Sequence, residues 1–263
     1  MINEVADQRV ERRPLVERSS PKASTSYTDY KDILRFDFFY SCAYCTMTEC
    51  EARGITFEID HYESKRARSD LIAEYSNLMW SCEECNGLKL DLIPPKKARA
   101  DGYRFFRPDE DIYEDHFEPD GFRVAPKTNV GEFTIDGVRL NRLSLRRLRE
   151  LRQRLFDCHA FIIEGVAGLR RTPIDRMPKE LRARMGSAIQ HASVVAESLA
   201  DQIDKALRSL AHSELIDDDP EAMEELKQRA ERLKERRAIY GGLWRGREFE
   251  VFPEKPKQEN GDQ

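Results

Sequence analysis

Leucine residues recur at helical spacing in the second half of the chain. Leu145, Leu148, Leu151 and Leu155 lie three or four residues apart, which is the interval that places side chains on one face of an α-helix. Apolar residues continue at this spacing until a Thr-Pro pair interrupts it. The pattern predicts an amphipathic helix over about residues 143–171.

Two further helices are predicted, over about residues 179–211 and 220–239. The last helix is expected to begin at Pro220, because proline has no amide hydrogen to lose at the first helical position and its φ angle already suits a helix. Gly241 and Gly242 are expected to end it, since glycine is common just past a helix C-terminus. A short strand and a polar tail follow.

The first half of the chain has shorter and more varied patterns. Residues 27–39 have the pattern of a short amphipathic helix or an extended lead-in, with Ile33, Leu34 and Phe38 facing inward. Residues 101–138 contain turn sequences such as Pro-Asp-Gly beside β-type runs, which predicts a small β-meander. The expected fold class is α+β. Its expected parts are a flexible N-terminal tail (1–26), a cysteine-rich core (27–100), a β-rich extension (101–142), a C-terminal helical module (143–252) and a flexible tail (253–263).

Composition narrows the class of protein. The chain has 263 residues, of which 35% are charged and 40% hydrophobic. No apolar run approaches the roughly 20 residues that a membrane-spanning helix needs, and the N-terminus has no apolar segment typical of a signal peptide. We therefore expect a cytoplasmic protein that has no membrane partner.

Four of the six cysteines form two Cys-x-x-Cys pairs. Cys42 is followed by Cys45, and Cys82 by Cys85, with 36 residues between the two pairs. Each pair offers two thiolates from one tight turn, and two pairs complete the tetrahedral ligand set of a structural zinc site. A redox dithiol and a chance occurrence are the alternatives. In a cytosolic chain the pattern favours zinc over a disulfide.

Polar residues that can carry out catalysis lie between and beside these pairs. Asp60 and His61 end a strand-like run, Asn77 precedes the second pair, and Asn86 and Lys89 follow it. In this order the residues resemble the HNH endonuclease family, whose catalytic unit is a ββα-metal fold. The positions that give the family its name fall on His61, Asn77 and Asn86. The resemblance covers the cysteine-rich segment and says nothing specific about the rest of the chain.

The resemblance implies a role for each of these residues. Asp60 would bind a divalent metal, Mg²⁺ or Mn²⁺, through its carboxylate, and Asn86 would be the second ligand. His61 would be the general base that activates water, and Asn77 would hold the His61 loop by hydrogen bonds. The zinc would hold the motif together without touching substrate. Ser64 stands where many family members have proline, so the loop after His61 is expected to be less constrained.

Elementary chemistry points the same way. Hydrolysis of a phosphodiester needs a base with a pKa near neutral, which histidine supplies, and a hard cation that oxygen ligands prefer. Each residue also has a plainer interpretation. His61 would then be a hydrogen-bonded structural residue, Asn86 a helix cap and Lys89 a solvated helix residue.

Basic residues are concentrated locally although the net charge is −5. Residues 139–184 contain thirteen Arg or Lys and five acids. Such patches bind the phosphates of DNA, although a solvated helix face is the alternative for the arginine run. The residues predicted to contact DNA are Lys65, Arg66, Lys89, Arg146, Arg149 and Arg152.

The segment after the motif supports a weaker comparison. Its β-rich stretch and Leu-Arg-rich helices are similar to the HNH nucleases of prokaryotic phage-defence systems, such as the Septu nuclease subunit, which work beside an ATPase subunit. We therefore expect a metal-dependent HNH endonuclease that acts on DNA. The weaker similarity would further imply an antiviral defence role and an ATPase or other partner at its helical module. The alternative is a non-catalytic, zinc-containing protein that binds nucleic acid or a partner.

Overall fold

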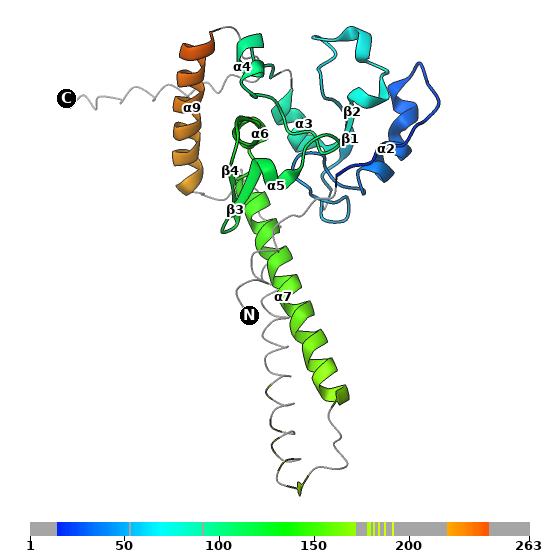
Figure 1. The fold of residues 1–263 in the computed structure, drawn as a ribbon, viewed down its shortest axis with the longest axis vertical. Helices are drawn as coiled ribbons and strands as arrows, with labels where there is room; N and C mark the ends of the chain where they lie inside the picture. Colours follow the sequence, from blue (N-terminus) through cyan, green and yellow to red (C-terminus); the bar gives the residue numbers. More distant parts are fainter. Residues whose placement is uncertain are drawn as a thin grey trace, which may run out of the picture.

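The computed structural model describes residues 15–52, 54–90, 92–171 and 220–241, with a few isolated positions between 178 and 191. Helices and strands are mixed (Figure 1), as the expected α+β class requires. In chain order the elements are η1 (Tyr27–Tyr30), α2 (Lys31–Asp37), β1 (Phe57–His61), η2 (Ser69–Leu71), η3 (Tyr75–Asn77), β2 (Leu78–Cys82), α3 (Glu83–Lys89), α4 (Lys96–Ala100), α5 (Tyr113–His116), β3 (Phe117–Asp120), β4 (Arg123–Pro126), α6 (Asn129–Val138), α7 (Leu143–Arg171) and α9 (Pro220–Tyr240).

A ββα unit forms the centre of the cysteine-rich core. β1 pairs antiparallel with β2, with Phe57 opposite Cys82 and His61 opposite Leu78. The helix α3 follows β2 directly and packs on both strands, while α2 packs on β2. All five residues of β2 are therefore buried. This explains why four of its five residues, all except Ser81, are apolar instead of alternating with polar ones.

The N-terminal segment is not wholly a flexible tail. Residues 15–26 lie against the core: Val16 is 2% exposed, and its amide donates to the Pro108 carbonyl at 2.7 Å. The amide and hydroxyl of Ser19 donate to the Asp37 carboxylate at 2.7 and 2.6 Å. The prediction of a tail is therefore wrong for residues 15–26, and residues 1–14 lie outside the described part of the chain.

Residues 101–142 contain less strand than the sequence predicts. The hairpin of β3 and β4 is the part of the meander that forms, and the next β-type run, Glu-Phe-Thr-Ile, belongs to the helix α6. This helix is buried on nearly all sides. Its β-branched and aromatic residues favour strands, which is why the sequence predicts a strand here. Gly131 lets it approach a neighbouring chain segment closely, because an added Cβ there would lie 2.1 Å from the His116 carbonyl oxygen.

Two long helices make up the described part of the helical module. α7 leaves the body of the molecule and extends well beyond it (Figure 1). α9 runs from Pro220 to Tyr240, with Gly241 at φ +63°, so both predicted ends are confirmed. Arg232 and Arg236 attach α9 to the Asp136 carboxylate of α6, at 2.6 and 2.8 Å.

The remaining sequence predictions for the C-terminal half lie mostly or wholly outside the described residues. They are the helix over 179–211, the strand after it and the tail over 253–263. None of the helices in the described part of the chain is both long enough and apolar enough to span a bilayer.

Candidate functional site

The four cysteines of the two pairs meet in the interior. Their sulfur atoms all lie within 4.8 Å of one another, and the Sγ atoms of Cys45 and Cys82 are 3.8 Å apart. A tetrahedral zinc with sulfur ligands at about 2.3 Å requires sulfur–sulfur distances of about 3.8 Å. The donor set and its spacing therefore fit a structural metal such as zinc.

Local turns of the chain build this cluster. In the first pair, the amide of Cys42 donates to the Met47 carbonyl at 2.9 Å, and Thr46 takes a positive φ of 61° to close the turn. In the second pair, Cys82 caps the N-terminus of α3, because its sulfur accepts from the amide of Cys85 at 3.5 Å. The amide of Ala43 donates to the carbonyl of the β2 residue Trp80 at 2.7 Å, which ties the first pair to the strand.

A buried arginine lies beside the cysteines. The guanidinium of Arg142 contacts the sulfur of Cys85 at 3.6 and 3.7 Å and forms an ion pair with Glu84 at 2.8 Å. Burial on its own raises the pKa of the Cys42 thiol, but hydrogen bonds from the other three cysteines outweigh burial and hold that pKa well below its usual value. The charge lies on Cys42, because the pKa of Cys82 is raised by its hydrogen bonds to Cys42 and Cys45 and that of Cys85 by burial. Arg142 partly neutralises this charge. Sequence reasoning did not assign this role to Arg142.

Asp60 lies on the α3 side of β1 and is buried. Its carboxylate accepts hydrogen bonds from the Tyr44 hydroxyl at 2.5 Å and from the Lys89 ammonium at 3.0 Å. Lys89 is 2% exposed and also donates to the His61 carbonyl at 2.8 Å. The prediction that Lys89 contacts DNA phosphates is therefore wrong, because its charge is paired inside the protein.

His61 is held from one side of its ring. Its Nε2 lies 2.9 Å from the carbonyl oxygen of Ile72. A carbonyl only accepts, so Nε2 must carry the proton and Nδ1 is left with the lone pair of a base. The ring of Tyr27 meets the imidazole edge-on, with centroids 4.9 Å apart, and His61 is 6% exposed.

The surroundings of His61 disfavour its charged form. Burial lowers the pKa of His61 below its ordinary 6.5, and the positive charges of Lys65 and Lys89 act in the same direction. The hydrogen bond to Ile72 and the charge of Asp60 oppose this shift without cancelling it. A neutral imidazole at physiological pH follows, and this is the form that a general base needs.

Asn77 ties together the two ends of the loop between β1 and β2. Its side-chain oxygen accepts from the amide of Glu63 at 2.8 Å. Its side-chain nitrogen donates to the carbonyls of Glu63 at 3.1 Å and Leu71 at 3.2 Å. Ser64 heads a tight turn in this loop, where its carbonyl accepts from the amides of Ala67 and Arg68. The loop is therefore constrained without the proline.

Asn86 lies on α3 and contacts a residue that sequence reasoning missed. Its side-chain nitrogen donates to the carboxylate of Glu58 at 2.7 Å, rather than to Asp60. Glu58 and Asp60 are two residues apart on β1 and so point to the same face of the sheet. This alternation is the signal in the sequence that points to Glu58. Side-chain oxygens of Glu58, Asp60 and Asn86 thus line the α3 side of the strand.

Among the described residues, the four cysteines are the single group of three or more His, Cys, Asp or Glu side chains close enough to share a metal ion. The site for a catalytic divalent cation therefore stays a prediction.

The residues predicted to contact DNA lie in different environments. Lys65 and Arg66 are exposed in the loop after His61, and the Lys65 ammonium lies 4.1 Å from the centroid of the Tyr27 ring. Basic groups therefore lie at the surface beside the candidate base, which suits an anionic substrate.

The arginines of α7 face the body of the protein. Arg149 is 4% exposed and donates to the Phe122 carbonyl at 3.3 Å. Arg152 donates to the Glu51 carboxylate at 2.9 and 2.7 Å and to the Thr46 carbonyl at 2.9 Å. The prediction that these two bind DNA phosphates is wrong, because protein groups already pair with them. Arg146 is half-buried with its Nε enclosed by protein, and its contact with DNA stays a prediction.

Comparisons of the chain with protein-family models, with curated proteins and with solved structures find no match. The function is therefore inferred from the site itself.

Proposed function

We propose that the protein is a metal-dependent endonuclease of the HNH type, which hydrolyses phosphodiester bonds in DNA. The observation that carries the proposal is the environment of His61. A neutral imidazole with its proton directed to Ile72 has the electronic state of a general base, and Asn77 restrains the loop that supplies the Ile72 carbonyl.

The chain's own residues divide the work as follows. Nδ1 of His61 takes the proton from the attacking water. The Ile72 carbonyl holds the ring in one tautomer, and its partial negative charge stabilises the imidazolium that results. Lys65 and Arg66 attract the phosphodiester backbone towards this base.

Oxygen donors on the α3 side of β1 fit a hard divalent cation. Asp60 and Asn86 would hold Mg²⁺ or Mn²⁺, with Glu58 beside them. The hydrogen bonds to Asp60 from Tyr44 and Lys89 leave acceptor capacity on its carboxylate, since each oxygen has two lone pairs. Such a cation would neutralise charge on the phosphate and the leaving oxygen.

One observation favours a second candidate, a non-catalytic zinc module that binds nucleic acid. Asp60 already has a cationic partner in Lys89 at 3.0 Å, so the pair would serve a structural role if no metal binds there. The defence role and a partner ATPase at the helical module stay predictions, as they rest on the weaker similarity.

Plasmid cleavage separates the two candidates. Purified protein is incubated with supercoiled DNA in Mg²⁺, in Mn²⁺ or in EDTA, beside His61→Ala and the control His191→Ala, which changes an exposed histidine. We expect cleavage that needs metal, is unchanged in His191→Ala and falls about 10²–10⁴-fold in His61→Ala. DNA binding without cleavage in any metal would support the non-catalytic module. Wild-type rates in His61→Ala would remove the base assignment.

A further inference from the structure

The loop between β1 and β2 contains the two residues that hold the His61 imidazole in place, Ile72 directly and Asn77 through the loop backbone. Its residue Ile72 accepts from the imidazole, and Asn77 at its end bridges to Glu63 and Leu71. The loop contains little regular structure of its own, only the short turns η2 and η3. Its position must therefore depend on contacts from elsewhere in the chain.

One such contact comes from the N-terminal segment. Nη1 of Arg18 donates to two backbone carbonyls, those of Tyr75 and Leu78, both at 2.9 Å. These carbonyls lie on either side of Asn77. The same guanidinium stacks against the rings of Phe38 and Tyr75, at 5.3 and 5.6 Å from their centroids. Arg18 therefore binds the backbone at the end of the loop from the side of the core.

A second contact comes from the segment after α4. Nη2 of Arg107 donates to the carbonyl of Ser76 at 2.9 Å, so it binds the residue between the two carbonyls that Arg18 holds. Its guanidinium also lies 4.7 Å from the ring centroid of Tyr62, the first residue after His61. Arg107 thus contacts both ends of the loop.

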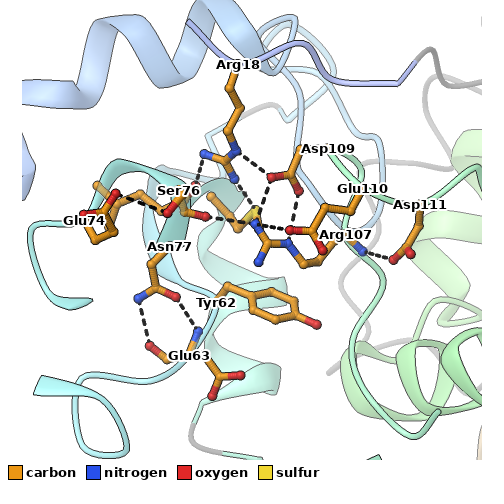
Figure 2. Close-up of polar contacts among 12 residues, drawn as sticks. Arg18, Tyr62, Glu63, Glu74, Ser76, Asn77, Arg107, Asp109, Glu110 and Asp111 are labelled. Carbon is orange, nitrogen blue, oxygen red and sulfur yellow. Dashed lines mark hydrogen bonds and ion pairs between the residues drawn. The ribbon is translucent and has the colours of Figure 1, made fainter. Parts of the chain in front are cut away.

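Asp109 joins the two arginines. Its Oδ2 accepts from Nε of Arg18 at 2.6 Å and from Nη2 of Arg107 at 2.8 Å, as Figure 2 shows. The Asp109 side chain is 6% exposed. Burial alone would raise the pKa of Asp109, but the two guanidinium groups outweigh burial and lower it. The carboxylate is thus charged at neutral pH and neutralises two arginines that have little solvent around them.

We propose that Arg18, Arg107 and Asp109 are positioning residues for His61. They hold the carbonyls at 75, 76 and 78, which fixes Asn77, and through Asn77 they fix the loop whose Ile72 carbonyl sets the tautomer of the imidazole. An effect of these three residues on catalysis rests on the proposed function. Their effect on the tautomer of the His61 imidazole does not. The N-terminal segment then contributes to the site, because it supplies Arg18.

The tautomer of the His61 imidazole can be measured directly, so this test does not depend on enzymatic activity. Protein with ¹⁵N-labelled histidine is studied by NMR at pH 8, and the His61 ring is assigned with His61→Gln. In wild type we expect an Nε2–H tautomer whose proton exchanges slowly, because it is bonded to Ile72. In Asp109→Asn we expect a mixture of tautomers and loss of the slowly exchanging proton. A wild-type ring signature in folded Asp109→Asn would overturn the proposal.

The matched control is Asp70→Asn. Asp70 lies in the same loop and also pairs with an arginine, Arg68, but both side chains are at least half-exposed. Asp70→Asn also removes one carboxylate charge, and we expect it to leave the tautomer of His61 unchanged. If charge loss alone altered the ring, both variants would show the change. If Asp109→Asn does not fold, Arg107→Gln removes the bond to Ser76 and is judged by the same criterion.

Cleavage kinetics give the second measurement. Misplacement of the base should lower kcat by about tenfold to a hundredfold with little change in KM. An unchanged kcat in folded Asp109→Asn would contradict the proposal. If wild type cleaves no substrate, the proposed function fails. The His61 tautomer measured by NMR in Asp109→Asn still decides whether Arg18, Arg107 and Asp109 position His61.

Discussion

The imidazole of His61 is expected to control the pH dependence of cleavage. A base acts in its neutral form, and burial lowers the pKa of His61 below 6.5. Cleavage, measured as kcat/KM, should therefore rise with pH at a midpoint below 6.5 and be level at neutral pH. Lys65→Gln removes a charge that lowers this pKa, so its midpoint should move upward. A midpoint above 6.5 in wild type would contradict this assignment of the base.

The ion pair of Lys89 and Asp60 makes a prediction about stability. Lys89→Met leaves the buried Asp60 carboxylate without its cation, which should cost about 3–5 kcal/mol in the free energy of unfolding. Urea unfolding measures this loss. The control Lys97→Met changes an exposed lysine on α4 and should stay within about 0.5 kcal/mol of wild type. Adding Asp60→Asn to Lys89→Met should recover part of the loss, since the uncompensated charge is removed.

At the residue scale, the motif predicts which residues gather but not which way each one points. The spacing placed Asp60, Asn77 and Asn86 near one ββα unit. It could not show that Lys89 turns inward, because a lysine on a short helix reads equally well as solvated or paired. Glu58 was missed because the resemblance names no residue there. Its position two residues before Asp60 becomes informative only when α3 is seen to cover that face.

At the scale of elements, α6 shows where pattern reading fails. The ends of α9 follow from proline and glycine chemistry, and the start of α7 follows from leucine periodicity. In α6 the helical spacing of Val130, Phe133 and Val138 is present but short, and its Val, Phe, Thr and Ile residues favour strands. The Thr128 hydroxyl, which caps the helix by accepting from Gly131, was the available signal for a helix start.

Gly131 in α6 tests whether close approach is the reason for the glycine. An alanine Cβ there would lie 2.1 Å from the His116 carbonyl oxygen, so backbone must shift. Gly131→Ala should lose about 1–3 kcal/mol, even though alanine favours a helix. The control is Gly87→Ala in α3, where nothing beyond its chain neighbours and the helix's own backbone lies within 4 Å of the added Cβ and a gain of about 0.4–1 kcal/mol is expected. Thermal melts of both variants decide this, and equal effects would contradict it.

At the scale of the whole molecule, the cysteine cluster connects the candidate site to the helical module. Arg142 joins the start of α7 to Cys85, and Arg152 joins α7 to Thr46 beside the first cysteine pair. The sequence predicted DNA contacts at Arg146, Arg149 and Arg152, because helical spacing identifies a face of α7 but not what that face meets. Because Arg142 and Arg152 bind groups of the core, the core and the start of α7 should form one unit.

Removal of the metal is expected to disrupt the core and the start of α7 together. Structural zinc contributes about 10–16 kcal/mol to folding, against a typical total stability of about 5–15 kcal/mol, so the core should not survive its loss. Cys82→Ser should therefore abolish the cooperative melt, and hydrogen exchange should show lost protection in β2 and also in α7 up to Arg152. Cys50→Ser is the control, because Cys50 is exposed and outside the cluster. Elemental analysis should find about one zinc per chain in wild type and Cys50→Ser. A protected α7 in a zinc-free Cys82→Ser protein would show that the helix does not depend on the cluster.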